Sequence, residues 1–310
     1  MAGGRVILTV TLNAALDVTY RVPVVQPGAE HRVEPGGTRA GGKGVNVARV
    51  LHALGHDTLV TGFAGGVTGL AIRTELDTAG IREALVDIDA PARRTVTVVS
   101  TEDGTATAFN EPGPPVSVGD WTRFVATYHS LASRADVVVL SGSLPPGLPD
   151  HAYAQLIGAT STATILDTAG RPLLAGLAAR PHVVKPNAEE LASATGLDDR
   201  PAAARWLRER GAGAVVASLG AAGLLAVTGD GTWRVSCPEP VHGNPTGAGD
   251  ACVAALAVGL ATGADWPSLL ADAVALSAAA VAGPLAGDVD LDTYRRLLST
   301  VEVQDAHADR

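Results

Sequence analysis

The chain has 310 residues, of which 46% are hydrophobic, and its 23 Lys and Arg against 32 Asp and Glu give a formal net charge of −9. A chain of about 300 residues buries roughly 75% of its unfolded surface, so one large or two small globular domains are expected and intrinsic disorder is excluded. The negative charge repels nucleic acid and anionic lipid at long range, which disfavours both as primary partners. Two cysteines are too few for a disulfide framework and indicate a reducing, cytoplasmic location.

Short β-branched runs recur along the chain, and many are separated by segments with helical spacing. The runs lie at residues 6–12, 58–63, 95–100, 136–141, 164–167, 182–185, 214–219 and 224–227. Residues 137–140 are continuously apolar, which is typical of a strand buried on both faces of a sheet. Such strands, alternating with helices, predict a three-layer α/β fold with a mainly parallel central sheet covered by helices on both faces.

Two apolar stretches could be mistaken for membrane segments. Residues 6–12 form a short run that contains two threonines, and they fit a buried strand better than a signal peptide. Residues 268–287 are interrupted by Asp272 and broken by Gly283-Pro284, so they are too polar for a membrane span. The sequence therefore predicts no association with a membrane.

Residues 13–40 and 92–113 depart from the alternation of strands and helices. They read as strands joined by Pro/Gly turns, such as Glu102-Asp103-Gly104. Strands that fit no parallel crossover predict a small separate sheet, which we expect to form a lid over the central sheet. Exposed edges of such a sheet are often covered by another subunit, so a homodimer through the lid is expected. No linker divides residues 1–310, which predicts a single domain.

Polar or glycine-rich tips follow almost every predicted strand. Ligands of open α/β sheets bind beyond the carboxyl ends of the strands. Turn chemistry alone can place such residues there, but five tips at the end of one sheet favour a shared site. The tips are Ser141-Gly142-Ser143, Asp167-Thr168, Lys185-Pro186-Asn187, Ser218-Leu219-Gly220 and residues 244–250.

The segment Gly247-Ala248-Gly249-Asp250 leads into an apolar helix. Its glycines let the backbone approach a ligand closely, and the free N–H groups and positive dipole end of the helix would form an anion hole. An acid in the first turn can simply stabilise the helix start. Beside these glycines, Asp250 is also suited to accept a proton from an attacking hydroxyl next to a bound phosphate.

A second glycine segment, Gly41-Gly42-Lys43-Gly44, opens another helix. With the residues before it, the segment nearly matches a P-loop, but Gly44 stands where a Ser or Thr must supply the magnesium ligand. A lysine at a helix N-terminus, together with Asn46, still suits a phosphate or a polyhydroxyl ligand. The alternative is a plain glycine turn into a helix.

Three further positions have two readings each. Asn187 and Glu190 face the same way at the start of a helix, and Glu190 could either help to hold hydrated magnesium or cap the helix. Asp17 could bind sugar hydroxyls or stand in a turn. Arg93 opens a lid strand, from which it could reach an anionic substrate group or lie at a solvated edge.

Together these motifs resemble the PfkB-type, ribokinase-like carbohydrate kinases in order and spacing, from Thr11 to about Leu291. The motifs that carry the resemblance are Gly41-Gly42-Lys43-Gly44-Val45-Asn46, Ser141-Gly142-Ser143-Leu144-Pro145, Lys185-Pro186-Asn187-Ala188-Glu189-Glu190, Ser218-Leu219-Gly220 and Gly247-Ala248-Gly249-Asp250. Residues 11–17 and Lys43 resemble the hexose-phosphate kinase branch, which contains the 1-phosphofructokinases and the tagatose-6-phosphate kinases. Residues 109–114 resemble the former more closely.

The resemblance implies a single ribokinase-like domain that uses ATP and Mg²⁺, with Asp250 as the catalytic base. It implies that the anion hole is formed by Gly247, Ala248 and Gly249. It implies ATP binding by Lys185, Asn187, Ser218, Gly220, Gly223, Gly247 and Gly249, and magnesium binding by Asn187 and Glu190. It implies that the sugar phosphate is held by Asp17, Gly41, Gly42, Lys43, Asn46, Arg93, Asn110 and Ser143.

The implied acceptor is a ketohexose phosphate, first of all fructose 1-phosphate, with tagatose 6-phosphate and fructose 6-phosphate as alternatives. Ala14 replaces a proline common in this branch, and Arg94-Thr95 replaces its usual hydrophobic residue and asparagine, which leaves the exact sugar open. A sensor that has lost turnover is a second reading, against which Asp250 and the glycines argue. A kinase for a neutral sugar or nucleoside is a third, against which Lys43 and residues 110–114 argue.

Overall fold

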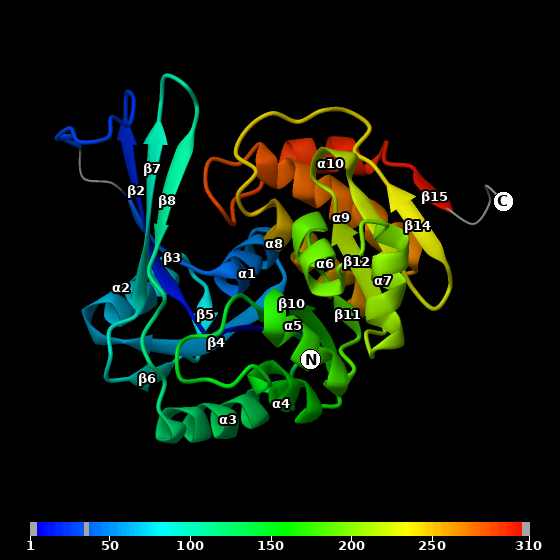
Figure 1. The fold of residues 1–310 in the computed structure, drawn as a ribbon, viewed down its shortest axis with the longest axis horizontal. Coiled ribbons are helices and arrows are strands. Elements are labelled where there is room, and N and C mark those ends of the chain that lie inside the picture. The colour runs from blue at the N-terminus through cyan, green and yellow to red at the C-terminus, as the bar shows by residue number, and fades with distance from the viewer. Residues whose placement is uncertain (1–4, 34–36, 306–310) are drawn as a thin grey trace.

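The fold is described by a computed structural model that covers residues 5–33 and 37–305. Residues 34–36 of the expected lid, and the two ends of the expected single domain, lie outside the described residues. The central sheet runs in the order β15 (Val303–Asp305), β14 (Thr232–Val235), β13 (Leu224–Val227), β12 (Ala214–Ser218), β11 (Val183–Val184), β10 (Ala163–Asp167), β9 (Val137–Ser141), β1 (Val6–Thr11), β4 (Asp57–Gly65) and β5 (Arg82–Glu83), and β6 (Val86–Ile88) also pairs with β4 (Figure 1).

The pairing within the central sheet is parallel from β12 across to β5 and antiparallel from β12 out to β15. The chain first builds outward from β1 to β4 and then returns to β9 on the other side of β1. This reversal makes a topological switch point at β1, and ligands of such sheets bind beyond the strand ends at that point. All the runs predicted as strands form strands, and the run 95–100 belongs to a second, smaller sheet.

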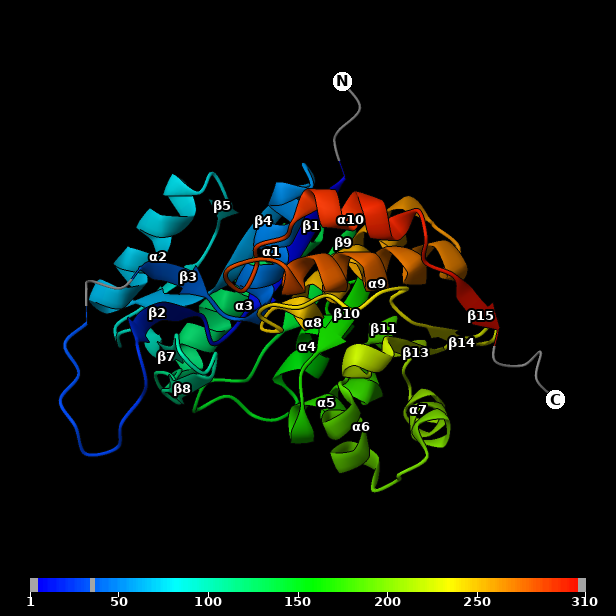
Figure 2. The same ribbon diagram turned by 90° about the horizontal axis from the view of Figure 1, so that it is seen from above.

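Helices cover both faces of the central sheet, which confirms the predicted three-layer α/β fold (Figure 2). In β9, Val137 and Val139 pack in one buried cluster and Val138 and Leu140 in the other, because successive side chains of a strand point to opposite faces. One face carries α1 (Lys43–Ala53), α8 (Ala248–Thr262), α9 (Trp266–Val281) and α10 (Leu291–Leu298). The other carries α3 (Val118–Ala132), α4 (Ala152–Gly158), α5 (Gly170–Gly176), α6 (Ala188–Thr195) and α7 (Arg200–Glu209).

A second, four-stranded sheet rises from one end of the molecule (Figure 1). Its strands, in order, are β3 (Thr38–Gly41), β2 (Ala15–Val22), β7 (Arg93–Ser100) and β8 (Ala106–Asn110). This is the small separate sheet that the sequence predicts. A third buried cluster joins the base of this sheet to α1, β4 and α2 (Gly66–Thr78), so apolar packing anchors the small sheet, which we call the lid, to the body.

No helix of residues 5–33 and 37–305 is long and apolar enough to cross a membrane. The apolar stretch at residues 268–287 does not form one continuous helix, because α9 ends at Val281.

Candidate active site

Helix α8 begins at the carboxyl end of the central sheet, after a backbone turn that only glycine tolerates well. Gly247 caps the helix with a φ of 92°, and a Cβ there would lie 2.9 Å from the Cα of Ala286. The Ala248 N–H donates to the Pro245 carbonyl at 3.3 Å, and the N–H groups of Gly249 and Asp250 have no acceptor within the helix. Asp250 stands in the same first turn and is 7% exposed, so its carboxylate is buried beside a potential anion site.

The carboxylate of Asp250 is tuned by its neighbours. Burial and the negative charge of Asp167 raise its pKa to about 7, while Asn46, Lys43 and Lys185 act in the opposite direction. Asn46 Nδ2 donates a hydrogen bond of 2.8 Å to Asp250 Oδ2. A carboxylate with a pKa near neutrality can hold a proton taken from a hydroxyl, which is the property required of a general base.

Asp167, at the end of β10, holds two lysines at once. Its Oδ1 atom lies 3.3 Å from Lys43 Nζ and 3.3 Å from Lys185 Nζ. Burial opposes the charge of Lys185, but Asp167 together with Cys252, Glu190 and Asp250 outweighs it, so the pKa of the ammonium is raised. A Cβ at Gly249 would lie 3.4 Å from Lys185 Nζ. The lysine charge therefore lies beside the N-terminus of α8, and both attract phosphate.

Sequence reasoning assigned no role to Asp167, although it noted the position at a strand tip. The scarcity of lysine also points to this site, because the sequence contains only two lysines among its 23 Lys and Arg residues. Both of them contact this one carboxylate. Lysine carries a compact point charge where arginine presents a broad planar fork, so lysines confined to one place indicate a site that needs small cations.

Asn187 and Glu190 form a capping box at the start of α6. The Asn187 N–H donates to Glu190 Oε2 and the Glu190 N–H donates to Asn187 Oδ1, each at 2.8 Å. The other carboxylate oxygen, Oε1, lies 3.7 Å from Lys43 Nζ. Glu190 thus caps the helix and also faces the lysine cluster, so the two readings of this residue are compatible.

The described residues contain no group of three or more His, Cys, Asp or Glu side chains that could hold a metal ion. The Oδ2 atom of Asp167 is buried without a hydrogen-bond partner. The Lys43 ammonium lies between the two carboxylates, 3.3 Å from Asp167 Oδ1 and 3.7 Å from Glu190 Oε1. Mg²⁺ keeps several waters and often binds through one or two carboxylates plus substrate phosphates. The residues present fit an ion held in that way and not in a cage of protein ligands.

Asp17 lies at the base of the lid, against β3. A Cβ at Gly41 would overlap the carboxylate of Asp17, at 1.9 Å from Oδ2, so glycine is required for this approach. Burial raises the pKa of Asp17, and a hydrogen bond from Thr95 and the charges of Arg93 and nearby arginines oppose the shift. Gly42 is the N-cap of α1, which brings this glycine segment next to Lys43.

Asn13, which sequence reasoning did not single out, joins the lid to the strand tips. Its Nδ2 atom donates to Ser143 Oγ at 3.0 Å and to the Pro112 carbonyl at 3.1 Å. Its own carbonyl accepts a 3.0 Å hydrogen bond from Arg93 Nε. Asn110, at the end of β8, pairs with Thr95 of β7 and is exposed. Three of the expected sugar-phosphate residues thus surround one edge of the lid base.

Other expected nucleotide residues lie at and after the ends of β11 and β12. Asn187 and Ser218 form an isolated parallel bridge, which places the tips of β11 and β12 together. Gly220 is exposed with a φ of 62°. Gly223 has a structural requirement of its own, because a Cβ there would lie 2.0 Å from the Val235 carbonyl of β14.

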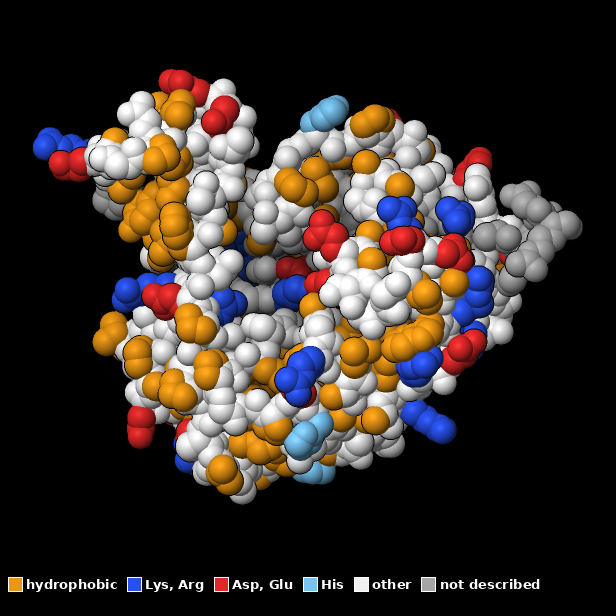
Figure 3. Space-filling view, in the orientation of Figure 1, with side chains coloured by type: hydrophobic (Ala, Val, Ile, Leu, Met, Phe, Trp, Pro, Cys, Tyr) orange, Lys and Arg blue, Asp and Glu red, His pale blue; other side chains and the backbone are white. Residues whose placement is uncertain are grey.

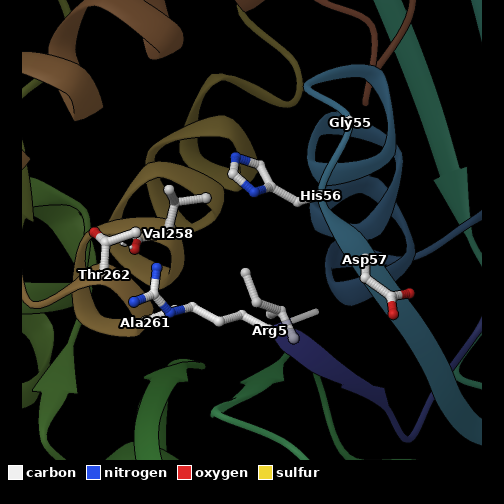
Figure 4. Close-up of a pocket in the computed structure, with 8 residues that line it drawn as sticks. Arg5, Gly55, His56, Asp57, Val258, Ala261 and Thr262 are labelled. Carbon is white, nitrogen blue, oxygen red and sulfur yellow. Dashed lines mark hydrogen bonds between the residues drawn. The ribbon is translucent and has the colours of Figure 1, made fainter. Parts of the chain in front are cut away.

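A hollow lies between lid and body, and basic and acidic side chains lie at its floor (Figure 3). A different cavity, of about 310 Å³, lies among the start of β1 and the ends of α1 and α8 (Figure 4). It is lined by Arg5, Ile7, Gly55, His56, Asp57, Val258, Ala261 and Thr262. None of the candidate site residues lines that cavity.

A mainly parallel α/β sheet with a separate small sheet, a buried carboxylate at a glycine-capped helix and two nearby lysines fits the phosphoryl-transfer site expected of a sugar kinase. The chain belongs to the pfkB family: the family described as "pfkB family carbohydrate kinase" matches residues 10–293. It is 34% identical over 308 residues to the 1-phosphofructokinase of Escherichia coli (strain K12), a match that covers 97% of this chain and 98% of the relative.

Solved structures show the same fold. Phosphofructokinase-2 from Escherichia coli, in complex with fructose-6-phosphate, matches with a TM-score of 0.88 at 30% identity, covering 96% of this chain and 99% of that one. A possible 1-phosphofructokinase from Thermotoga maritima matches with a TM-score of 0.88 at 27% identity, covering 97% and 100%. The resemblance seen in the sequence is thereby confirmed, while the roles of individual residues stay predictions.

The pKa of Asp250 predicts the acidic side of the pH profile. A carboxylate with a raised pKa of about 7 is protonated below that pH, so kcat/KM should fall as the pH drops through about 7. Asp167→Asn removes a charge that raises this pKa and should move the fall to lower pH. Initial rates between about pH 5 and pH 9 measure both effects, with Asp77→Asn on the exposed side of α2 as control. An unmoved profile in Asp167→Asn would contradict the coupling.

Proposed function

We propose that the protein transfers the γ-phosphoryl group of ATP to a hydroxyl of a ketohexose phosphate, and that the acceptor is fructose 1-phosphate, which becomes fructose 1,6-bisphosphate. The observation that carries the proposal is the buried Asp250 at the glycine-capped start of α8, together with two lysines that pair with Asp167 and act on the charge of Asp250. The similarity to a 1-phosphofructokinase over nearly the whole chain supports this acceptor.

Asp250 takes the proton of the acceptor hydroxyl while the oxygen of that hydroxyl forms a bond to the γ-phosphorus. The bond from that phosphorus to the bridging oxygen breaks, and its electron pair leaves with ADP. The N-terminus of α8, Lys43 and Lys185 stabilise the charge that spreads over the transferred oxygens. Mg²⁺, held by the ATP phosphates near Glu190 and Asp167, would neutralise part of the phosphate charge.

On the acceptor side, Asp17 accepts hydrogen bonds from sugar hydroxyls in this proposal, and Arg93 binds the acceptor phosphate. Burial lowers the pKa of Arg93, and Asp17 and Glu111 oppose this, so its charge is retained for an anion. Closure of the lid over the hollow would exclude water and limit hydrolysis of ATP.

The test is a coupled assay of ADP release by the purified chain with MgATP and each of four acceptors: fructose 1-phosphate, tagatose 6-phosphate, fructose 6-phosphate and fructose. We expect the highest kcat/KM with fructose 1-phosphate. The related phosphofructokinase-2 structure holds fructose 6-phosphate. A higher kcat/KM with that sugar would make it the acceptor in place of fructose 1-phosphate. Binding of a sugar phosphate and ATP without turnover would support a sensor and overturn the kinase proposal.

Homodimerisation through the lid is part of the proposal. Residues opposite each other in a sheet share a face, so the register places Val18, Val96 and Phe109 in one apolar row. Asp17 and Thr95 alternate with that row and lie on the other face. Phe109 is 60% exposed. An apolar row on the face opposite the substrate residues fits contact with the lid of a second copy.

We expect Phe109→Glu to shift the protein from dimer to monomer, because a charge in a small apolar contact must be desolvated. Light scattering after size exclusion at micromolar concentration measures the mass. Val118→Glu changes another exposed apolar residue, 84% exposed at the start of α3, and should leave the mass unchanged. A wild-type protein that is already monomeric would refute the lid dimer and leave the kinase proposal intact.

A further inference from the structure

Outside the proposed substrate contacts, a network of charged side chains lies where the lid meets the body. Arg39 of β3 binds Asp288 with Nη2 and Oδ1 2.5 Å apart. Arg49 of α1 pairs with Glu75 of α2 and donates a 3.2 Å hydrogen bond to the Ala40 carbonyl. The Ala40 N–H donates to the same Glu75 oxygen, at 3.0 Å. Strand β3 is therefore held by charges from both α2 and the loop between α9 and α10.

That loop, residues 283–288, also contacts the phosphoryl-transfer site. A Cβ at Gly247 would lie 2.9 Å from the Cα of Ala286 and 3.0 Å from the nitrogen of Gly287. A Cβ at Gly287 would lie 3.3 Å from the Cα of Asn46, and Asn46 is the residue that donates to Asp250. The loop thus packs against the N-cap of α8 and against the partner of the proposed catalytic base.

The strand at the other end of the ion pair contacts the acceptor site. β3 ends at Gly41, whose backbone lies against the carboxylate of Asp17, and the next residues begin α1 at Lys43. Arg39 also faces Asp17 across the β2–β3 pair, and its charge acts on the pKa of Asp17. A displacement of β3 would therefore move residues proposed to hold the sugar phosphate.

We propose that Arg39 and Asp288 are positioning residues, which clamp the acceptor-binding base of the lid to the loop that supports the N-cap of α8. This inference rests on the proposed kinase function. The side chains are 22% and 30% exposed, so the pair is shielded enough to differ from the weak ion pairs of an open surface. A misplacement of about 1 Å between acceptor and donor can cost about a hundredfold in rate, so a clamp between the two sites acts on catalysis.

Arg39→Gln and Asp288→Asn each remove one half of the pair. We expect each to lower kcat/KM for the acceptor about tenfold, through a lower kcat and a higher acceptor KM. The double variant should lose about as much as either single variant, because the second change removes nothing further. Arg39→Lys keeps the charge and should restore part of the activity. Arg295→Ala breaks an exposed pair with Asp292 on α10 and serves as the matched control.

The outcomes separate the clamp from its rivals. If Arg39 instead binds the acceptor directly, Asp288→Asn frees it and should leave activity equal or higher, which would overturn the proposal. Losses that multiply in the double variant would overturn it as well. Single variants with a lower melting temperature but wild-type kinetics would show a purely structural pair and also refute the clamp.

A readout without turnover distinguishes failure of the clamp from failure of the kinase proposal. Amide hydrogen exchange of the ligand-free protein should rise in Arg39→Gln on both sides of the pair, at residues 38–41 and at residues 247–251. A rise confined to residues 38–41 would show that the pair does not connect the two sites. A wild-type protein inactive on every acceptor would refute the proposed function, whereas this exchange pattern would still decide the clamp.

Discussion

Replacement of Asp250 by asparagine should reduce kcat at least about a hundredfold, which corresponds to about 2.7 kcal/mol of transition-state stabilisation. Asparagine keeps the shape of the side chain but cannot take the proton of the acceptor hydroxyl. The variant loses no favourable contact with ATP, so ATP affinity should stay close to that of the wild type. Steady-state rates with saturating acceptor, and titration of ATP by calorimetry, measure the two quantities.

The same variant has a second expected consequence, for stability. Burial raises the pKa of Asp250 to about 7, so the ionised carboxylate destabilises the fold, and a neutral amide should not lower the melting temperature at pH above about 7. Asp230→Asn, in an exposed turn, controls for the loss of a charge. Normal turnover in Asp250→Asn would contradict the role of Asp250 as the base. An unfolded variant would contradict the expectation that the ionised, buried carboxylate destabilises the fold.

Lys43→Met should lower kcat/KM for the acceptor about a hundredfold, the effect of removing one donor that stabilises charge in a closed site. The methionine keeps the length and the apolar stem of the side chain. Lys43 also lowers the pKa of Asp250, so its loss should raise that pKa and move the acidic fall in activity to higher pH. Rates over the same pH range as for the wild type, with each acceptor at several concentrations, measure both effects.

Lys43→Arg keeps the charge and is the matched control for the Lys43→Met variant. Arginine has a wider head than lysine, and the Lys43 ammonium lies 3.3 Å from Asp167 and 3.7 Å from Glu190. We therefore expect partial activity and an unshifted pH profile. If Lys43→Met lowered activity but left the profile in place, the electrostatic link between Lys43 and Asp250 would be refuted while the binding role would stand.

Local sequence patterns determined the elements of the fold and the places where ligands could bind. The β-branched run at residues 137–140 predicts a buried strand because its side chains suit burial on both faces, and β9 forms there. The capping box of Asn187 and Glu190 and the glycine before α8 are equally local, since the bond partners or the positive φ lie within a few residues. The family resemblance combined these local motifs into a function.

The sequence could not show which tips meet. Lys43, Asp167 and Lys185 come from three separate parts of the chain. Only the order β11-β10-β9-β1 brings the two lysines to the carboxylate of Asp167. The pKa of Asp250 follows from that arrangement, because burial and neighbouring charges set it and neither is visible in a motif. The dual use of Glu190, as a cap and as a neighbour of Lys43, has the same cause.

The pair between Arg39 and Asp288 spans 249 residues, which no local pattern can predict. The sequence by itself determined the strands, the glycine-capped helix starts, the family and the residue types available for phosphate. Only the tertiary structure decided how the lysines share Asp167, where the lid meets the loop beside Gly247 and how strongly Asp250 holds a proton. The physical reason is that secondary structure and caps depend on neighbours along the chain, whereas charge coupling and desolvation depend on neighbours in space.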